Sequence, residues 1–162
     1  MRVAGYKWLF IDTSSKHGGL ALASGFDGRR WTRGTNQATY APSPDSLWGI
    51  NAFHDVHRAR WSGRKFGMVM VGVVGFGRVA IFQHGWRAEK AEIVAICIHR
   101  RLWRHTEKDE RQLLIGKLRA AYDVPVFRSM RQFRRETERW GVPGNALVRH
   151  GDVGPEPPAV TS

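Results

Sequence analysis

Cysteine is almost missing from this 162-residue sequence, which contains only Cys97. A single thiol excludes a disulfide within the chain and any metal site that is built from several thiolates. Cys97 lies inside the apolar run 93–98. This position predicts that Cys97 packs as a small core side chain and does not act as a nucleophile.

Long apolar runs are missing as well. The longest weakly charged run, 66–74, falls far short of the roughly 20 residues that a membrane-spanning helix needs. Residues 1–10 contain no apolar stretch long enough for a signal peptide. We therefore expect a cytoplasmic protein that does not interact with a membrane.

Recognisable catalytic motifs are also missing. The glycines at 72, 75 and 77 do not follow the dinucleotide-binding order, and the next segment is predicted to be a strand where that motif requires a helix. The sequence contains no serine elbow and no phosphate-binding loop. Glu89 and Glu92 are three apart on a predicted strand, so they face opposite sides and form no acid–base pair. We expect no enzyme, no catalytic residue and no cofactor.

Seven histidines raise the question of a metal site. His54 and His57 are three apart, a spacing that places two side chains on one face of a helix. A catalytic zinc needs three protein ligands, and spacing ties no third residue to this pair. We therefore interpret them as surface histidines and expect no metal.

Lysine is scarce, although the chain is strongly basic. Only six of the 26 basic residues are lysines, and with 14 acidic residues the formal net charge is +12 and the pI about 11.0. The planar guanidinium group binds phosphate or carboxylate through paired hydrogen bonds, and a pI above about 9 is typical of nucleic-acid-binding domains. A genome of high GC content, which encodes arginine wherever a surface cation suffices, is the alternative. Both explanations stay open, because an excess over the whole chain does not locate a patch.

The apolar periodicity predicts one α+β domain over residues 1–150, in which an antiparallel sheet curls and is packed by two C-terminal helices. Its strands are predicted at 6–11, 20–23, 47–53, 68–74, 78–82 and 86–98, with a turn at residues 84–85 before the last. Gly72, Gly75 and Gly77 predict bulges or bends that let the sheet curl. Residues 151–162, rich in glycine and proline, predict a disordered tail.

Local patterns predict where the helices begin and which faces they bury. Asp55 should cap a short helix over 56–61, and residues 106–109 resemble a capping box for the first long helix. A second capping box begins at Ser129, and this last helix should end at Gly141. The stripes expected to face the core are Leu113, Leu114, Leu118, Ala121 and Tyr122 on the first long helix, and Met130, Phe133, Thr137 and Trp140 on the second.

The face of the last helix opposite its apolar stripe is rich in arginine. The residues expected on this surface are Arg131, Arg134, Arg135 and Arg139, extended by Arg128 at the helix start and by Arg100, Arg101 and Arg104 after the long strand. Such a surface could follow the phosphates of a nucleic acid, which would make its binding depend steeply on salt. The alternative is a solvated helix face that Glu136 and Glu138 partly neutralise.

Four segments, at 33–39, 41–45, 49–53 and 77–89, form a further pattern, and the last of them ends in Gly-Trp-Arg-Ala-Glu. They resemble an uncharacterised family of small actinobacterial and actinobacteriophage proteins. Relatives often carry Cys-x-Cys before the Gly-Ile-x-Ala strand, where this chain has Ser46-Leu47-Trp48. The resemblance therefore implies no zinc site and no catalytic residue. It implies a phage or prophage gene in a high-GC bacterial host, which would also account for the arginine content.

Two functions stay open. The favoured one is a non-enzymatic phage-type accessory protein that binds a host macromolecule, above all a host protein, in the cytoplasm of the bacterial host. This hypothesis rests on analogy and predicts an exposed apolar patch of several hundred Å². The alternative is a nucleic-acid-binding module that uses the arginine-rich face of the last helix.

Overall fold

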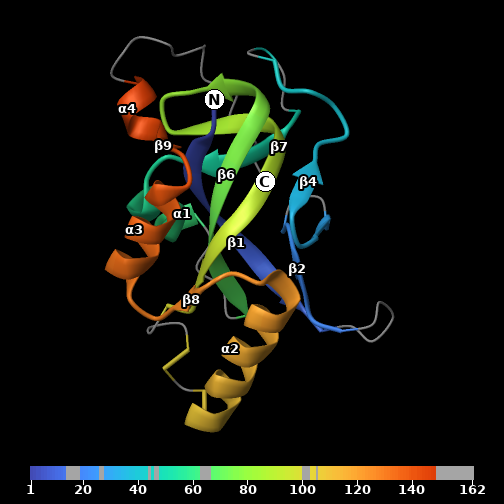
Figure 1. The fold of residues 1–162 in the computed structure, drawn as a ribbon, viewed down its shortest axis with the longest axis vertical. Coiled ribbons are helices and arrows are strands. Elements are labelled where there is room, and N and C mark those ends of the chain that lie inside the picture. Colours follow the sequence, from blue (N-terminus) through green and yellow to red (C-terminus); the bar gives the residue numbers. More distant parts are fainter. Residues whose placement is uncertain are drawn as a thin grey trace.

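A computed structural model describes residues 1–13, 19–25, 28–43, 45, 48–62, 67–99, 103–104 and 106–148, with the backbone alone at 60–62 (Figure 1). Its strands are β1 (Val3–Asp12), β2 (Ala21–Ala23), β3 (Arg30–Trp31), β4 (Thr35–Gln37), β5 (Ile50–Phe53), β6 (Met68–Ile81), β7 (Gly85–Cys97), β8 (Val126–Phe127) and β9 (Val142–Pro143). Its helices are α1 (Val56–Ser62), α2 (Lys108–Tyr122), α3 (Met130–Arg139) and α4 (Gly144–Val148). The predicted α+β class is confirmed. The predicted tail at 151–162 lies outside the described residues.

The longest strands, β6 and β7, form the predicted antiparallel hairpin. Its register shifts between Gly72 and Val73, and again between Phe76 and Val79, where Gly77 has a φ of +77°. The bulges predicted at Gly72 and Gly77 are confirmed. At Gly75 the bulge alternative is excluded, because this residue pairs with Ala91 in a regular stretch of the ladder.

The sheet curls until it closes on itself. β1 pairs antiparallel with β6 over eight residue pairs, while β5 pairs with β7 on one side and with β1 on the other. The pairing of β5 with β1 consists of one residue pair, Tyr6 with Phe53, and it completes the ring β1–β6–β7–β5. The predicted curled sheet is therefore confirmed. Among the strands that the structure describes, only the short β8 and β9 pair parallel, with β7 and β1 respectively.

Trp86 fills the inside of this ring. It is 1% exposed, and its indole Nε1 donates a hydrogen bond to the Ala4 carbonyl oxygen at 3.1 Å. Glycines on the two paired strands β1 and β6 leave room for its ring: a Cβ at Gly5 would lie 2.9 Å from Trp86 Cε2, and one at Gly75 2.5 Å from its Cζ3. The ring is therefore a packed core, without space for a ligand inside it.

The strands bury both faces, each under different helices (Figure 1). On one face, α1 and α3 cover Tyr6, Trp8, Met70 and Cys97 together with the rest of that cluster. The other face and the interior of the ring form the larger cluster, which includes Trp86 and the buried side chains of α2. The two predicted C-terminal helices therefore pack on opposite sides of the sheet.

The first long helix differs from its prediction in two details. α2 begins at Lys108 with Glu107 as its N-cap, and no side chain makes a capping hydrogen bond there, so the capping box predicted at 106–109 is wrong. Leu113 is 61% exposed, while Ile115 is buried with Leu118 and Tyr122. These three side chains recur at intervals of three and four residues, and Leu113 does not continue that series.

Candidate nucleic-acid interface

Local sequence signals determine where α3 begins and which of its faces is buried. The side-chain oxygen of Ser129 accepts a hydrogen bond from the backbone N–H of Gln132 at 3.4 Å, which confirms the predicted N-cap. Phe133 and Thr137, four residues apart, are fully buried against the sheet. Gly72 of β6 allows the close approach, since a Cβ there would lie 2.9 Å from the Cβ of Thr137. One face of α3 is therefore fixed in the core.

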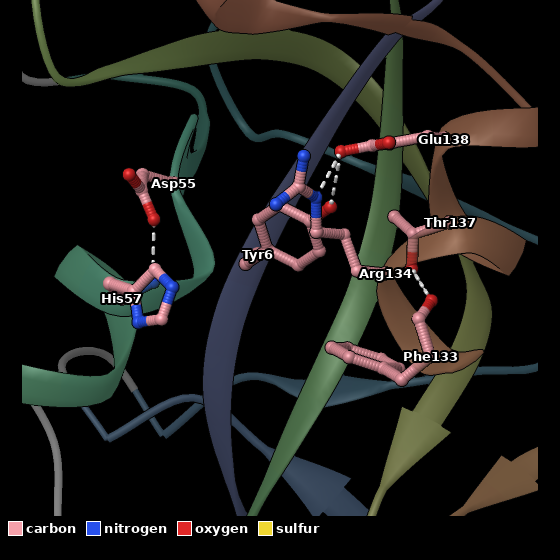
Figure 2. Close-up of polar contacts among 7 residues, drawn as sticks. All are labelled: Tyr6, Asp55, His57, Phe133, Arg134, Thr137 and Glu138. Carbon is pink, nitrogen blue, oxygen red and sulfur yellow. Dashed lines mark hydrogen bonds and ion pairs between the residues drawn. The ribbon is translucent and has the colours of Figure 1, made fainter. Parts of the chain in front are cut away.

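Next to this buried face of α3, a polar contact joins the helix to β1 (Figure 2). The Tyr6 hydroxyl donates to Glu138 Oε1 at 3.3 Å, and Arg134 Nε donates to the same oxygen at 2.9 Å. Burial of Tyr6, with the nearby Glu138 carboxylate, raises the pKa of the phenol well above its ordinary value. The hydroxyl therefore stays protonated and keeps donating to Glu138.

The end of α3 differs from the prediction at Trp140, which is 53% exposed and not in the core. The last helical residue is Arg139, and beyond Trp140 the chain turns at Gly141 into β9, beside β1. The Trp140 indole Nε1 donates to Glu136 Oε1 at 3.0 Å, and Glu136 also accepts from Arg139 at 3.1 Å. Trp140 therefore lies along its own helix in solvent.

The structure brings five of the eight predicted arginines together. We call Arg128, Arg131, Arg134, Arg135 and Arg139 the arginine face. All five are exposed; Arg134 and Arg139 remain 56% and 76% exposed although they pair with Glu138 and Glu136. Within the described ranges the other three, Arg128, Arg131 and Arg135, form no ion pair.

The remaining three predicted arginines do not lie on α3. Arg104 is exposed on the connection between β7 and α2. Arg100 and Arg101 lie outside the described residues. The extension of the patch by this second group therefore stays a prediction.

The interpretation of the histidine pair as surface residues is wrong for His54. Its side chain is 6% exposed, and its Nε2 hydrogen-bonds to the Phe82 carbonyl oxygen at 2.7 Å, whereas His57 is exposed on α1. Burial, with a smaller contribution from His84, lowers the pKa of His54 below its ordinary value. In the part of the chain that the structure describes, no three His, Cys, Asp or Glu side chains group closely enough to hold a metal ion.

Cys97 is fully buried on the face of the sheet that α1 and α3 cover. Burial raises the pKa of its thiol to about 12. Since the thiolate is the reactive form, Cys97 is unreactive in the folded protein. The prediction that it packs in the core is confirmed.

Beside the start of α3 lies an open hollow of about 520 Å³, lined by His99, Arg128, Ser129 and Met130. Parallel pairing of β7 with β8 brings its walls together: Cys97 pairs with Phe127, so the residues that follow the two strands are neighbours. Sequence reasoning missed this hollow, because no local pattern connects His99 with a residue almost 30 positions further along the chain. The position of Arg128 at this hollow therefore follows from tertiary pairing and not from the local sequence.

Sequence reasoning also missed an exposed aromatic pair. Tyr40 and Trp48 are 57% and 56% exposed, and their ring centroids lie 4.7 Å apart. Composition alone does not separate such surface aromatics from the buried ones, such as Trp86. The pair is a second surface feature that a partner could contact.

The comparisons with known protein families, with curated proteins and with solved structures found no match to this chain. The resemblance to small actinobacterial and actinobacteriophage proteins therefore stays a prediction. None of the helices in the described ranges combines the length and apolar character needed to cross a membrane.

Proposed function

We propose that this chain binds nucleic acid, and that the arginine face of α3 contacts the phosphate backbone. The observation that carries the proposal is the gathering of five exposed guanidinium groups on one anchored segment, three of them without an acidic partner in the described ranges. Each arginine that neutralises a phosphate releases condensed counterions, and this release favours binding. A positive surface of this kind fits a phosphate backbone better than it fits an apolar protein surface.

The attachment of α3 supports this function, because it fixes the backbone from which the arginine side chains project. Phe133 and Thr137 hold the helix to the sheet, and Glu138 joins it to Tyr6. Groups that are already ordered lose little conformational entropy on binding. Arg131 and Arg135 are four residues apart, so their Cβ atoms lie about 6 Å from one another on the same side of the helix. Their two charges are therefore close enough to contact successive phosphates.

Sequence preference is expected to be weak. Phosphate contacts position a protein on nucleic acid but carry no base information. The arginine face occupies a helix of ten residues whose apolar side is buried in the core. We expect binding to duplex and single-stranded DNA alike, in the cytoplasm of a bacterial host if the gene belongs to a phage or prophage.

The experiment is fluorescence anisotropy on labelled duplex and single-stranded DNA with the variant Arg131→Glu/Arg135→Glu. Arg134 is left unchanged so that its contact with Glu138 survives. Two lost charge-assisted contacts should weaken binding by about tenfold or more at low salt. The matched control Lys117→Glu/Arg119→Glu makes the same charge change at exposed positions of α2. Equal losses in both variants, or no loss in the first, would contradict the proposal.

A second candidate function, binding of a host protein, is favoured by the exposed Tyr40–Trp48 pair. Tyrosine and tryptophan are enriched among the residues that contribute most to protein interfaces. Over the described residues the exposed large apolar side chains are Met1, Tyr40, Trp48, Leu113, Trp140 and Val142. Tyr40 contacts Trp48, and Val142 lies beside the start of β1. In a pull-down from host extract, Tyr40→Ser/Trp48→Ser should lose a captured protein that Arg131→Glu/Arg135→Glu retains. Capture that survives the aromatic substitutions would rule out this surface.

A further inference from the structure

The hollow beside the start of α3 differs from the rest of the arginine face in its shape. His99 follows β7, Arg128 follows β8, and Met130 opens α3, so three separate elements form its walls. The Ile98 N–H donates to the Phe127 carbonyl oxygen at 2.9 Å, which fixes the two segments beside each other. A volume of about 520 Å³ lies within the range of small-molecule sites, roughly 300–1,000 Å³. The space therefore accommodates a group the size of a nucleotide.

We propose that this hollow binds the terminal phosphate of a nucleic-acid strand, together with part of the nucleotide that carries it. The inference rests on the proposed function and adds a preference for strand ends. An internal phosphodiester continues into chain on both sides, whereas a terminal nucleotide enters a hollow from one side. A terminal phosphate also carries a charge of about −1.5 to −2 at pH 7, more than the single charge of a diester.

The lining residues supply the chemistry that such a group requires. Arg128 is exposed, and its planar guanidinium group can donate two parallel hydrogen bonds to a phosphate. His99 also lines the hollow, and an imidazole ring is of a kind that hydrogen-bonds to phosphate oxygens through a ring N–H. The Ser129 hydroxyl oxygen accepts from Gln132 N–H, which leaves its own hydrogen as a further donor. Met130 adds an adaptable apolar surface for a sugar or a base.

The experiment compares otherwise identical single-stranded oligonucleotides that end in a hydroxyl or in a phosphate, at the 5′ and at the 3′ end. The wild-type full chain should bind one of the phosphorylated strands at least fivefold more tightly than the hydroxyl strand. Arg128→Gln should remove this preference but retain salt-dependent binding through the rest of the face. Arg119→Gln, which removes the same charge from an exposed position of α2 outside the arginine face, should keep the preference.

Direct titration with a nucleoside monophosphate separates this inference from the proposed function. Saturable binding that Arg128→Gln abolishes supports the hollow, even if no oligonucleotide binds and the arginine face is wrong. Equal affinity for phosphate and hydroxyl ends in the wild type would overturn the inference, although strand binding itself persists. A preference that survives Arg128→Gln would overturn it too. Circular dichroism of each variant verifies that the fold is intact.

Discussion

Replacement of Gly72 by alanine tests how α3 is seated on the sheet. The new Cβ would lie 2.9 Å from both Cβ and Cγ2 of Thr137, and closer still to its hydroxyl oxygen. Thr137 is fully buried, and its hydroxyl donates to the Phe133 carbonyl oxygen at 3.0 Å. The threonine therefore has no free space to enter, and α3 must move away from β6.

The expected cost follows from two opposing terms. Inserting a methyl group into a packed core destabilises a protein by about 1–3 kcal/mol. The loss of glycine's freedom in the unfolded chain gives back about 0.4–1 kcal/mol. We expect the free energy of unfolding of Gly72→Ala to fall by about 1–2 kcal/mol. In the double variant Gly72→Ala/Thr137→Ala two of the three nearest atoms, Oγ1 and Cγ2, are gone, so the combined loss should be smaller than the sum by at least about 0.5 kcal/mol.

Urea unfolding of the wild type, both single variants and the double variant measures these terms. The midpoint should shift while the dependence on denaturant stays constant, since the surface exposed on unfolding is nearly the same in all four proteins. DNA affinity should also fall in Gly72→Ala, because the arginine face moves with the helix. A variant as stable as the wild type, or strictly additive losses in the double variant, would refute the close contact between β6 and α3.

Three further predictions concern buried groups. The depressed pKa of His54 means that the folded state binds a proton less readily than the unfolded state. The urea midpoint should therefore fall as the pH drops below the ordinary histidine range, and His54→Gln should make the midpoint less dependent on pH. The Tyr122 hydroxyl accepts a hydrogen bond from Leu22 N–H at 2.6 Å and donates one to the Trp31 carbonyl oxygen at 3.0 Å. Tyr122→Phe should therefore lower the free energy of unfolding by about 1–3 kcal/mol in the same assay, and an unchanged value would contradict these contacts. With a thiol pKa of about 12, Cys97 should react with a disulfide reagent only after unfolding, and fast labelling of the native protein would show that it is accessible.

The parts of the site that local sequence determines could be predicted. Ser129 caps α3, and the spacing of Phe133 and Thr137 defines its buried side, so the opposite side had to carry the arginines. The same periodicity gave a wrong result for Trp140, because the apolar pattern runs one residue beyond the helix. A periodic pattern shows which side of a helix is buried, but the turn that ends the helix decides where that side stops.

The parts that depend on distant pairing could not be predicted. The ring closes through one residue pair between β1 and β5, which no local pattern specifies. His54 lies between Phe53 and Asp55, which do not reveal whether it is buried, and Phe82 and Gly144, far away in the chain, pack against it. Arg128 likewise joins His99 only through the pairing of β7 with β8. In each case the side chain's role follows from tertiary contacts.

The most direct test of the arginine face is the slope of the logarithm of the association constant for duplex DNA against the logarithm of the salt concentration. Three to five phosphate contacts give a wild-type slope of about −2.7 to −4.5. Arg131→Gln/Arg135→Gln should make the slope shallower by about 1.8, whereas Lys117→Gln/Arg119→Gln on α2 should leave it unchanged. A slope that both pairs of substitutions reduce equally, or that neither reduces, would contradict the central claim that α3 contacts the phosphates.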